Sequence, residues 1–569
     1  MIWIGKKLVG IPLVVRTRRL ARAFLADAVR APEIQRARLL ELVRRHASSG
    51  FGRDHRFDEI RTAADYRRRV PIRGYEGHEP YIAQVREGQT GALFGPGTEV
   101  LMFAMTSGTT ARPKTIPVTR ESLRAYRESW KIWGMLAFEA YPRMIQRGLR
   151  PILQLVSDWK EQTTAGGIPC GAITGLTAAM QNPLVRVAYC MPAATMGIKD
   201  VEAKYYTALR LSAYQDLGAI FAANPATLLG MARLGEREAE CLIRDLRNGT
   251  LDERFAVPGP VRAALRWRIA RKRPRTARRL EEALEREGRL SGRAIWPNLD
   301  FVGVWTGGTM GAYLKRFPEQ FGEVPVRDIG LIASEGRFTI PIESGTPAGV
   351  IDFRHHYYEF IPEDQVDREE PETVEAADLV EGRNYYLVPT TAGGLYRYHI
   401  YDLVRCAGFY GRAPMLIFLS KGSHFSSLAG EKLSEFQVVA AVNRAAELVG
   451  LKPKGYLLLP KWGEPPSYEL LIEADDLADT VEGQRLAAEV DRQLCQQNRE
   501  YEDRRATRRL GPIATRRIAP GSWTEFQRRR LARSGGTAEQ YKQPCLLPDL
   551  EALEQFTAVD GPSEQVKGR

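Results

Sequence analysis

Short apolar runs alternating with longer helical patterns constrain the fold of this chain more than any other feature of its sequence. Helical patterns cover residues 17–47 and 121–140. Strand-like runs lie at residues 99–104, 151–156, 299–304, 328–333, 349–353 and 385–388. Such an alternation of strands and helices is typical of mixed α/β proteins. We therefore expect an α/β fold in which β-sheets are flanked by helices.

The end of the chain repeats this pattern on a smaller scale. With 569 residues the chain exceeds one compact core, so two or three domains are expected. After the apolar run 415–419 come a helix, two strands and a helix, at residues 431–448, 456–460, 468–473 and 481–497. The sequence therefore predicts a large mixed α/β domain over residues 1–418 and a small α/β domain over residues 419–569.

The chain is basic, with a formal net charge of +13. Clusters of cationic residues occur at 262–279, 504–517 and 528–533. A nucleic-acid interface requires a basic face interleaved with aromatic side chains or a known binding module. None of the clusters offers such a face or module, so we read them as solvated helix faces and connecting loops and expect no nucleic-acid partner.

Cysteine usage and the N-terminus bear on location. The six cysteines lack paired short spacings, which argues against a zinc site or a disulfide framework and favours a reduced, cytoplasmic protein. Residues 1–15 are apolar, but Lys6 and Lys7 interrupt the run and no cleavage site follows. No run reaches the ~20 apolar residues of a membrane helix. We expect an amphipathic helix packed on the domain, without stable membrane insertion.

The segment TSGTTARPK, residues 106–114, is the first candidate for chemistry. A loop of hydroxyl residues around a glycine, placed after a strand and ending in a lysine, suits the phosphates of a nucleotide. Backbone N–H groups and hydroxyls donate hydrogen bonds, and the lysine adds charge. The spacing is not that of a Walker loop. By itself the segment fits a plain Ser/Thr turn equally well.

Three further segments carry candidate polar groups. In IASEG, residues 332–336, Glu335 follows an apolar run and offers oxygen ligands for Mg²⁺. In LYRYHIYDLVRC, residues 395–406, Asp402 can accept hydrogen bonds from both ribose hydroxyls, and Arg405 can contact phosphate or ribose. In QYKQP, residues 540–544, Lys542 can approach the α-phosphate. Taken alone, each segment fits a structural role better, including an Asp402–Arg405 salt bridge.

Together and in this order, the segments resemble the adenylate-forming superfamily. With IWPNLDFVGVWTGGTMGAYL (295–314) and AGEKLSE (429–435), they resemble a bacterial-type member of the Gretchen Hagen Three (auxin-responsive) acyl acid-amido synthetases over residues 30–550. The sequence departs from the superfamily pattern at Ala111, at Leu331 and Ile332, at His399 and Tyr401, and at the domain junction, Ser420 and Lys421.

The resemblance implies an ATP-dependent ligase with a mobile C-terminal domain that activates a carboxylic acid as acyl-AMP and transfers the acyl group to an amine or amino acid. It implies ATP and Mg²⁺ as cofactors and a monomer or weak dimer. Lys542 and Glu335 would be catalytic, with Glu335 at Mg²⁺ and Thr306 and Thr309 facing substrate. The nucleotide would be bound by Thr106, Ser107, Gly108, Thr109, Thr110, Lys114, Ser334, Glu335, Asp402 and Arg405.

Two alternatives stay open from the sequence. The acyl group could pass to coenzyme A or to a carrier-protein thiol instead of an amine. The departures at Ala111, His399 and Tyr401 also allow a basic binding protein that has kept the fold and lost catalysis. The identity of the acid and of the amine cannot be read from the chain, because fold does not fix substrate.

Overall fold

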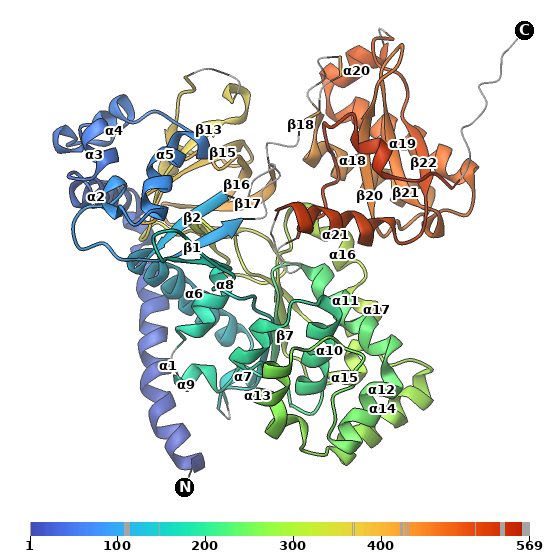
Figure 1. The fold of residues 1–569 in the computed structure, drawn as a ribbon. Coiled ribbons are helices and arrows are strands. Elements are labelled where there is room, and N and C mark those ends of the chain that lie inside the picture. Colours follow the sequence, from blue (N-terminus) through green and yellow to red (C-terminus); the bar gives the residue numbers. More distant parts are fainter. Residues whose placement is uncertain are drawn as a thin grey trace, which may run out of the picture. The chain divides into compact units, whose positions relative to one another are not determined.

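A computed structural model describes residues 2–559 except 107–113, 147, 182, 367, 369, 422–424, 427, 430, 432, 507 and 535–540. The chain groups into two compact units (Figure 1). The first contains the chain up to Ile400 and Val404–Phe418, and the second contains Tyr401–Leu403, Leu419–Ser534 and the chain from Tyr541 onward. Both units combine strands and helices, so the expected mixed α/β class is confirmed.

Three larger sheets organise the first unit. One has the order β2-β1-β5-β4, with strands Lys114–Thr119, Val100–Thr106, Pro169–Gly171 and Gln162–Thr163. A parallel sheet has the order β3-β6-β7-β8, with strands Ile152–Gln154, Ala219–Phe221, Phe301–Val304 and Val326–Asp328. The third has the order β11-β12-β17-β16-β15-β13-β14, with strands Thr339–Ile340, Gly349–Ile351, Ala413–Lys421, Asp402–Tyr410, Asn384–Thr390, Tyr357–Pro362 and Val374–Glu375.

Helix α6 (Arg120–Ala140) follows β2 directly and illustrates how local sequence sets an element. The Thr119 hydroxyl oxygen accepts a hydrogen bond from the backbone N–H of Ser122, and the Ser122 hydroxyl oxygen accepts one from the backbone N–H of Thr119, which forms a capping box. This arrangement satisfies two backbone donors that the first helical turn leaves open. Trp133 on the buried face contacts Phe221 of β6 edge-to-face. The predicted helix at residues 121–140 is therefore confirmed.

The predicted helix at residues 17–47 is wrong as one continuous element. Helix α1 (Ile2–Asp27) ends before a 3₁₀ turn, Ala28–Arg30, and α2 (Ala31–Arg45) begins anew. Pro32 lies in the first turn of α2, where its missing N–H costs nothing; inside a longer helix it would remove a hydrogen bond and clash with the preceding turn. The proline therefore fixes the break.

The predicted strand at residues 328–333 is also wrong in its extent. Strand β8 ends at Asp328, and Gly330 has φ +90, a backbone conformation that favours glycine. A Cβ at Gly330 would lie 2.3 Å from the carbonyl oxygen of Thr339. The chain turns here and resumes as a short hairpin, β9 (Ile332–Ala333) and β10 (Gly336–Arg337).

The N-terminal helix packs on the first unit through its second half. Phe24 stacks on Phe353 at 4.8 Å between ring centroids, and Arg18 forms an ion pair with Glu139 of α6. Val14 packs against the same core. In the part of the chain that the structure covers, no helix combines the length and apolar character needed to cross a bilayer.

The second unit is built on the sheet β20-β21-β22, with strands Tyr456–Lys461, Ser467–Glu473 and Ala514–Ile518. Helices α18 (Glu435–Val449) and α19 (Thr480–Gln497) supply much of its apolar core. The predicted helix–strand–strand–helix order is confirmed. Two elements of this unit were not predicted, β22 and α21 (Ser522–Ser534). In β22, Arg516 and Arg517 interrupt the apolar pattern.

Candidate active site

The frame of the predicted phosphate loop is an antiparallel strand pair. Thr106 ends β1, Lys114 begins β2, and the two residues are paired in register. The predicted contact residues Ser107, Gly108, Thr109 and Thr110 lie outside the described residues. The Lys114 ammonium lies 5.5 Å from the ring centroid of Tyr75, within the range of a cation–π interaction. The residues that flank the loop, Thr106 and Lys114, therefore lie next to each other at the same end of this strand pair.

Glu335 lies in the turn of the β9–β10 hairpin beside Ser334. Its side chain is buried, at 8% exposure, and Ser334 is half-buried. The turn packs closely, because a Cβ added at Gly336 would lie 3.0 Å from Nε2 of His356. Glu335 was expected at the end of a buried strand. In the structure it lies instead in the turn of a hairpin.

Arg337 anchors this hairpin and was missed by sequence reasoning. Its buried guanidinium donates to the carbonyl oxygens of Ile329 and Thr339 and lies 4.3 Å from the ring centroid of Trp130. Burial lowers the pKa of Arg337 to about 10. These contacts tie the hairpin that carries Glu335 to helix α6 and to the chain after β8.

Thr306 follows β7 and is held by Asp328 at the end of the neighbouring strand β8. Its backbone N–H and hydroxyl donate to Oδ2 of Asp328 at 2.6 and 2.7 Å, and the backbone N–H of Gly330 donates to Oδ1 at 2.6 Å. Burial raises the pKa of Asp328. Thr309 lies in the 3₁₀ turn Gly308–Met310, and the described atoms do not include its side chain.

Asp328 could not be found by the rule applied to Glu335, because Arg327 directly precedes it and only the structure shows that it ends the parallel strand β8. The carboxyl ends of parallel strands are where α/β proteins place ligand-binding groups. The indole N–H of Trp305 also donates to the carbonyl oxygen of Gly330, at 2.9 Å. The structure thus brings Thr306 and the segment leading to Glu335 together at one edge of the parallel sheet.

Asp402 is the first residue of β16 and is 2% exposed. The segment before it turns tightly, because Arg397 (φ 43) and Tyr401 (φ 62) adopt the left-handed region. Arg397 forms a buried ion pair with Glu359, with Nε 2.9 Å from Oε2. Arg405 donates to Oδ1 of Asn384 at 3.0 Å. The segment LYRYHIYDLVRC thus combines a structural arginine with a carboxylate at the start of a strand.

Lys542 is exposed and precedes a segment that joins the sheet of the second unit. The backbone of Leu458 in β20 donates to Cys545 and accepts from Leu547. The backbone N–H of Cys545 also donates to the buried carboxylate of Glu435, the first residue of α18. Burial raises the pKa of Glu435 to about 7. The lysine is therefore displayed from a segment that is fixed on its C-terminal side.

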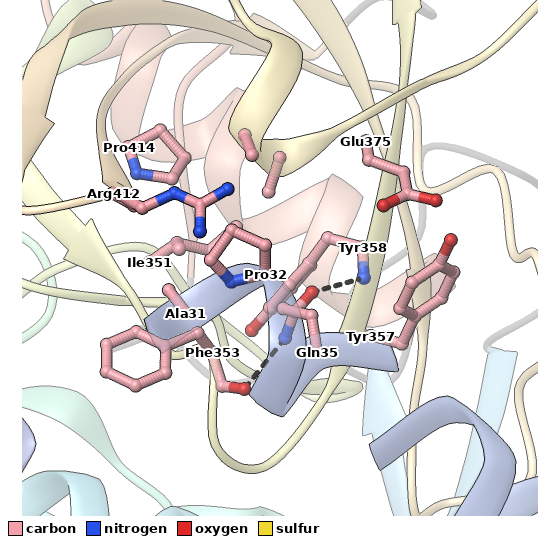
Figure 2. Close-up of a pocket in the computed structure, with 12 residues that line it drawn as sticks. Ala31, Pro32, Gln35, Ile351, Phe353, Tyr357, Tyr358, Glu375, Arg412 and Pro414 are labelled. Carbon is pink, nitrogen blue, oxygen red and sulfur yellow. Dashed lines mark hydrogen bonds between the residues drawn. The ribbon is translucent and has the colours of Figure 1, made fainter. Parts of the chain in front are cut away.

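A small cavity elsewhere in the first unit is structural. It has a volume of about 10 Å³, room for one water molecule, and lies between α2 and β13 (Figure 2). Gln35 spans it, donating to the carbonyl oxygen of Phe353 and accepting from the backbone N–H of Tyr358 (Figure 2). None of the predicted site residues lines it.

The described side chains match one kind of magnesium site, in which the ion is bound mainly by nucleotide phosphates and water. The described residues hold no cluster of three or more His, Cys, Asp or Glu side chains suited to a metal ion. A magnesium ion bound to nucleotide phosphates takes one or two protein carboxylates, with phosphates and water completing its shell. A single buried carboxylate such as Glu335 matches that requirement.

Comparison with known proteins gives matches over nearly the whole chain. Three models match in order: the GH3 family N-terminal domain at residues 20–326, the central domain at 349–421 and the C-terminal domain at 436–551. A probable indole-3-acetic acid-amido synthetase, GH3.12 of Oryza sativa subsp. japonica, is 26% identical, covering 91% of this chain and 92% of the relative.

Two further relatives agree. A jasmonoyl–L-amino acid synthetase, GH3.5 of the same rice, is 25% identical, covering 90% of this chain and 92% of its own. The solved structure of the GH3.15 acyl acid amido synthetase superposes with a TM-score of 0.83 at 20% identity, covering 94% of this chain and 95% of that one. At this identity the superposition establishes the shared fold.

Proposed function

Because the chain belongs to the GH3 family, we propose that it is an ATP-dependent acyl acid-amido synthetase. The ordered match of all three family domains carries this proposal. The substrates would be a carboxylic acid and an amino acid or another amine; the names of two relatives specify indole-3-acetic acid-amido and jasmonoyl–L-amino acid synthesis. A bacterial-type origin and a monomeric or weakly dimeric state remain predictions.

In the first half-reaction an oxygen of the acid attacks the α-phosphorus of ATP. The bond from the α-phosphorus to the β-phosphate oxygen breaks, pyrophosphate leaves, and an acyl-adenylate remains. A carboxylate is a poor acyl donor, and the mixed anhydride gives it AMP as a leaving group. All reactants are anionic, so positive charge and hydrogen-bond donors must hold them in line.

The chain offers groups for that task. Thr106, the loop after it and Lys114 would bind the phosphates, and Asp402 and Arg405 would bind the ribose side. Glu335 and Ser334 would lie near the α-phosphate, with Glu335 holding Mg²⁺, which when bound neutralises phosphate charge. Lys542 would contact the α-phosphate. Support comes from the buried carboxylates of Glu335 and Asp402 and from the register of Thr106 with Lys114.

In the second half-reaction the amine nitrogen attacks the acyl carbon. The bond from that carbon to the adenylate oxygen breaks, AMP leaves, and the nitrogen loses a proton to give the amide. Thr306 would face the acyl group, and Asp328 would position it, because Asp328 accepts both the backbone and the hydroxyl hydrogen of Thr306. A movement of Lys542 with its unit between the half-reactions is part of the proposal.

The decisive experiment is ATP–pyrophosphate exchange over a panel of carboxylic acids, followed by mass spectrometry of products with a panel of amino acids. We expect acid-dependent exchange in the presence of Mg²⁺ and an amide product with release of AMP. A thioester formed with coenzyme A in place of an amide would assign the chain to acyl–thiol ligation. Absence of exchange with every acid, in a folded protein that binds polyanions, would support a degenerate binding protein.

A further inference from the structure

The basic segment 262–279 divides into two groups of side chains in the structure. Three arginines serve the fold: Arg262 donates to the carbonyl oxygens of Leu251 and Asp252, Arg279 donates to those of Ala294 and Ile295, and Arg273 lies over Tyr214. The other six are exposed on α13 (Gly259–Ile269), α14 (Pro274–Glu287) and their connection: Arg266, Arg268, Arg271, Lys272, Arg275 and Arg278. With Trp267 these six form the α13–α14 patch.

The cations of the α13–α14 patch are not held in ion pairs within the described part of the chain, although α14 continues with Glu281, Glu282, Glu285 and Glu287. None of its six cations forms an ion pair with any residue that the structure describes, and the segment 262–279 contains no Asp or Glu. The other basic clusters differ. Arg505 pairs with Asp491, Arg516 with Glu469, and both Arg528 and Arg529 with Glu525. Unpaired like charges repel one another, so a counter-charge from another molecule would stabilise the patch.

The α13 part of the patch also presents apolar surface. Trp267 is 75% exposed. Ala263, Ala264 and Ala270 are exposed too and stand three or four residues from Trp267, so they share its side of the helix.

An apolar stripe with an indole, bordered by cations, has the chemistry of an interfacial helix, whose tryptophan lies at headgroup level while cations meet lipid phosphates. Single-stranded nucleic acid instead selects a succession of aromatic platforms along a groove. The patch has one indole and a stripe of alanines, which complements acyl chains better than bases.

We propose that the α13–α14 patch docks this protein peripherally on an anionic lipid surface. Trp267 and the alanine stripe would enter the headgroup region, and the six cations would contact lipid phosphates. The docking is separate from the ligase activity, because none of the residues proposed for catalysis belongs to the patch.

Flotation with phosphatidylcholine vesicles containing increasing fractions of phosphatidylglycerol tests the proposal on the full chain. We expect binding that rises with the anionic fraction and falls with salt. Each removed cation should lower the partition coefficient roughly fivefold, so Arg266→Gln with Arg268→Gln should lower it roughly 25-fold. Trp267→Ala should also lower the partition coefficient, without changing its dependence on salt.

Matched controls come from the second unit. The double variant Arg528→Gln with Arg529→Gln removes the same number of positive charges as the patch variant, but from two arginines that form ion pairs with Glu525. Trp462→Ala removes an indole that is 72% exposed. Both controls should bind vesicles like the wild type, and all variants should retain wild-type circular dichroism and ligase activity.

Four outcomes would overturn the proposal. Patch variants could bind anionic vesicles as the wild type does, or the wild type could fail to prefer anionic over neutral vesicles. Removal of residues 2–11 could abolish binding while the patch variants retain it, which would place the lipid contact on α1. Patch variants could lose affinity for a single-stranded RNA oligonucleotide but not for vesicles, which would assign the patch to nucleic acid.

Discussion

The carboxylate of Glu435 accepts a hydrogen bond from the backbone N–H of Cys545, three residues beyond Lys542, at 2.5 Å. Glu435 is buried in the second unit, and the positive charges of Lys542 and Arg530 act on it only weakly compared with its burial. A buried carboxyl group therefore supports the segment that displays the lysine proposed for adenylation.

This burial predicts a pH-dependent stability. The pKa of Glu435 is raised from 4.5 to about 7, so the folded protein holds the proton more tightly than the unfolded chain. The resulting stabilisation is complete below pH 4.5 and is lost as pH rises through about 7. Glu435→Gln keeps an acceptor without the charge, so its stability relative to the wild type should rise between pH 5 and 8, by up to about 3 kcal/mol.

Denaturant unfolding of the full chain at pH 5 and at pH 8 measures the difference in free energy of unfolding between Glu435→Gln and the wild type. Glu502→Gln, at an exposed position in the same unit, is the matched control and should follow the wild type. A constant difference between Glu435→Gln and the wild type across this range would contradict the assignment.

Lys542→Ala should slow acyl-adenylate formation by about 10²–10³-fold, because one charged donor at the reacting phosphate is lost. Amide formation from preformed acyl-adenylate should change far less. Exchange of pyrophosphate measures the first step, and single-turnover amide formation measures the second. Lys452→Ala, at an exposed lysine of the same unit, should leave both rates unchanged. Wild-type exchange in Lys542→Ala would exclude Lys542 from adenylation.

Glu335→Gln should weaken the response to Mg²⁺, since a neutral amide is a poorer ligand than a carboxylate. We expect the Mg²⁺ concentration for half-maximal exchange to increase about tenfold or more, with a lower maximal rate. A magnesium titration of the exchange rate provides the measurement, with exposed Glu343→Gln as control. An unchanged magnesium midpoint would remove Glu335 from the metal site.

Asp328→Asn should disturb the acyl site through Thr306. An amide group at residue 328 cannot accept all three of the hydrogen bonds that the carboxylate receives from Thr306 and Gly330. We expect a higher KM for the acid, with the KM for ATP less affected. Thr306→Val removes only the hydroxyl and should give a smaller change in the same direction. Equal increases in both KM values would indicate general misfolding instead.

Local sequence determined the elements whose signals lie within a few residues. The apolar run at residues 99–104 predicted most of β1, and the pattern at residues 121–140, which a Thr119–Ser122 cap precedes, predicted α6, because these signals act over one strand or one helical turn. The order of the motifs also identified the family, since several ordered weak signals together are specific.

Tertiary structure decided what depends on residues far apart in the chain. Glu335 lies in a hairpin turn held by Arg337 against Trp130, and Thr306 is bound by Asp328 of another strand. The basic clusters looked alike in sequence, yet arginines at 504–517 and 528–533 found acidic partners while six cations of 262–279 did not. Sequence fixes which charges exist, but the packing of distant segments determines which of them meet, because a charge pair forms only within a few ångströms.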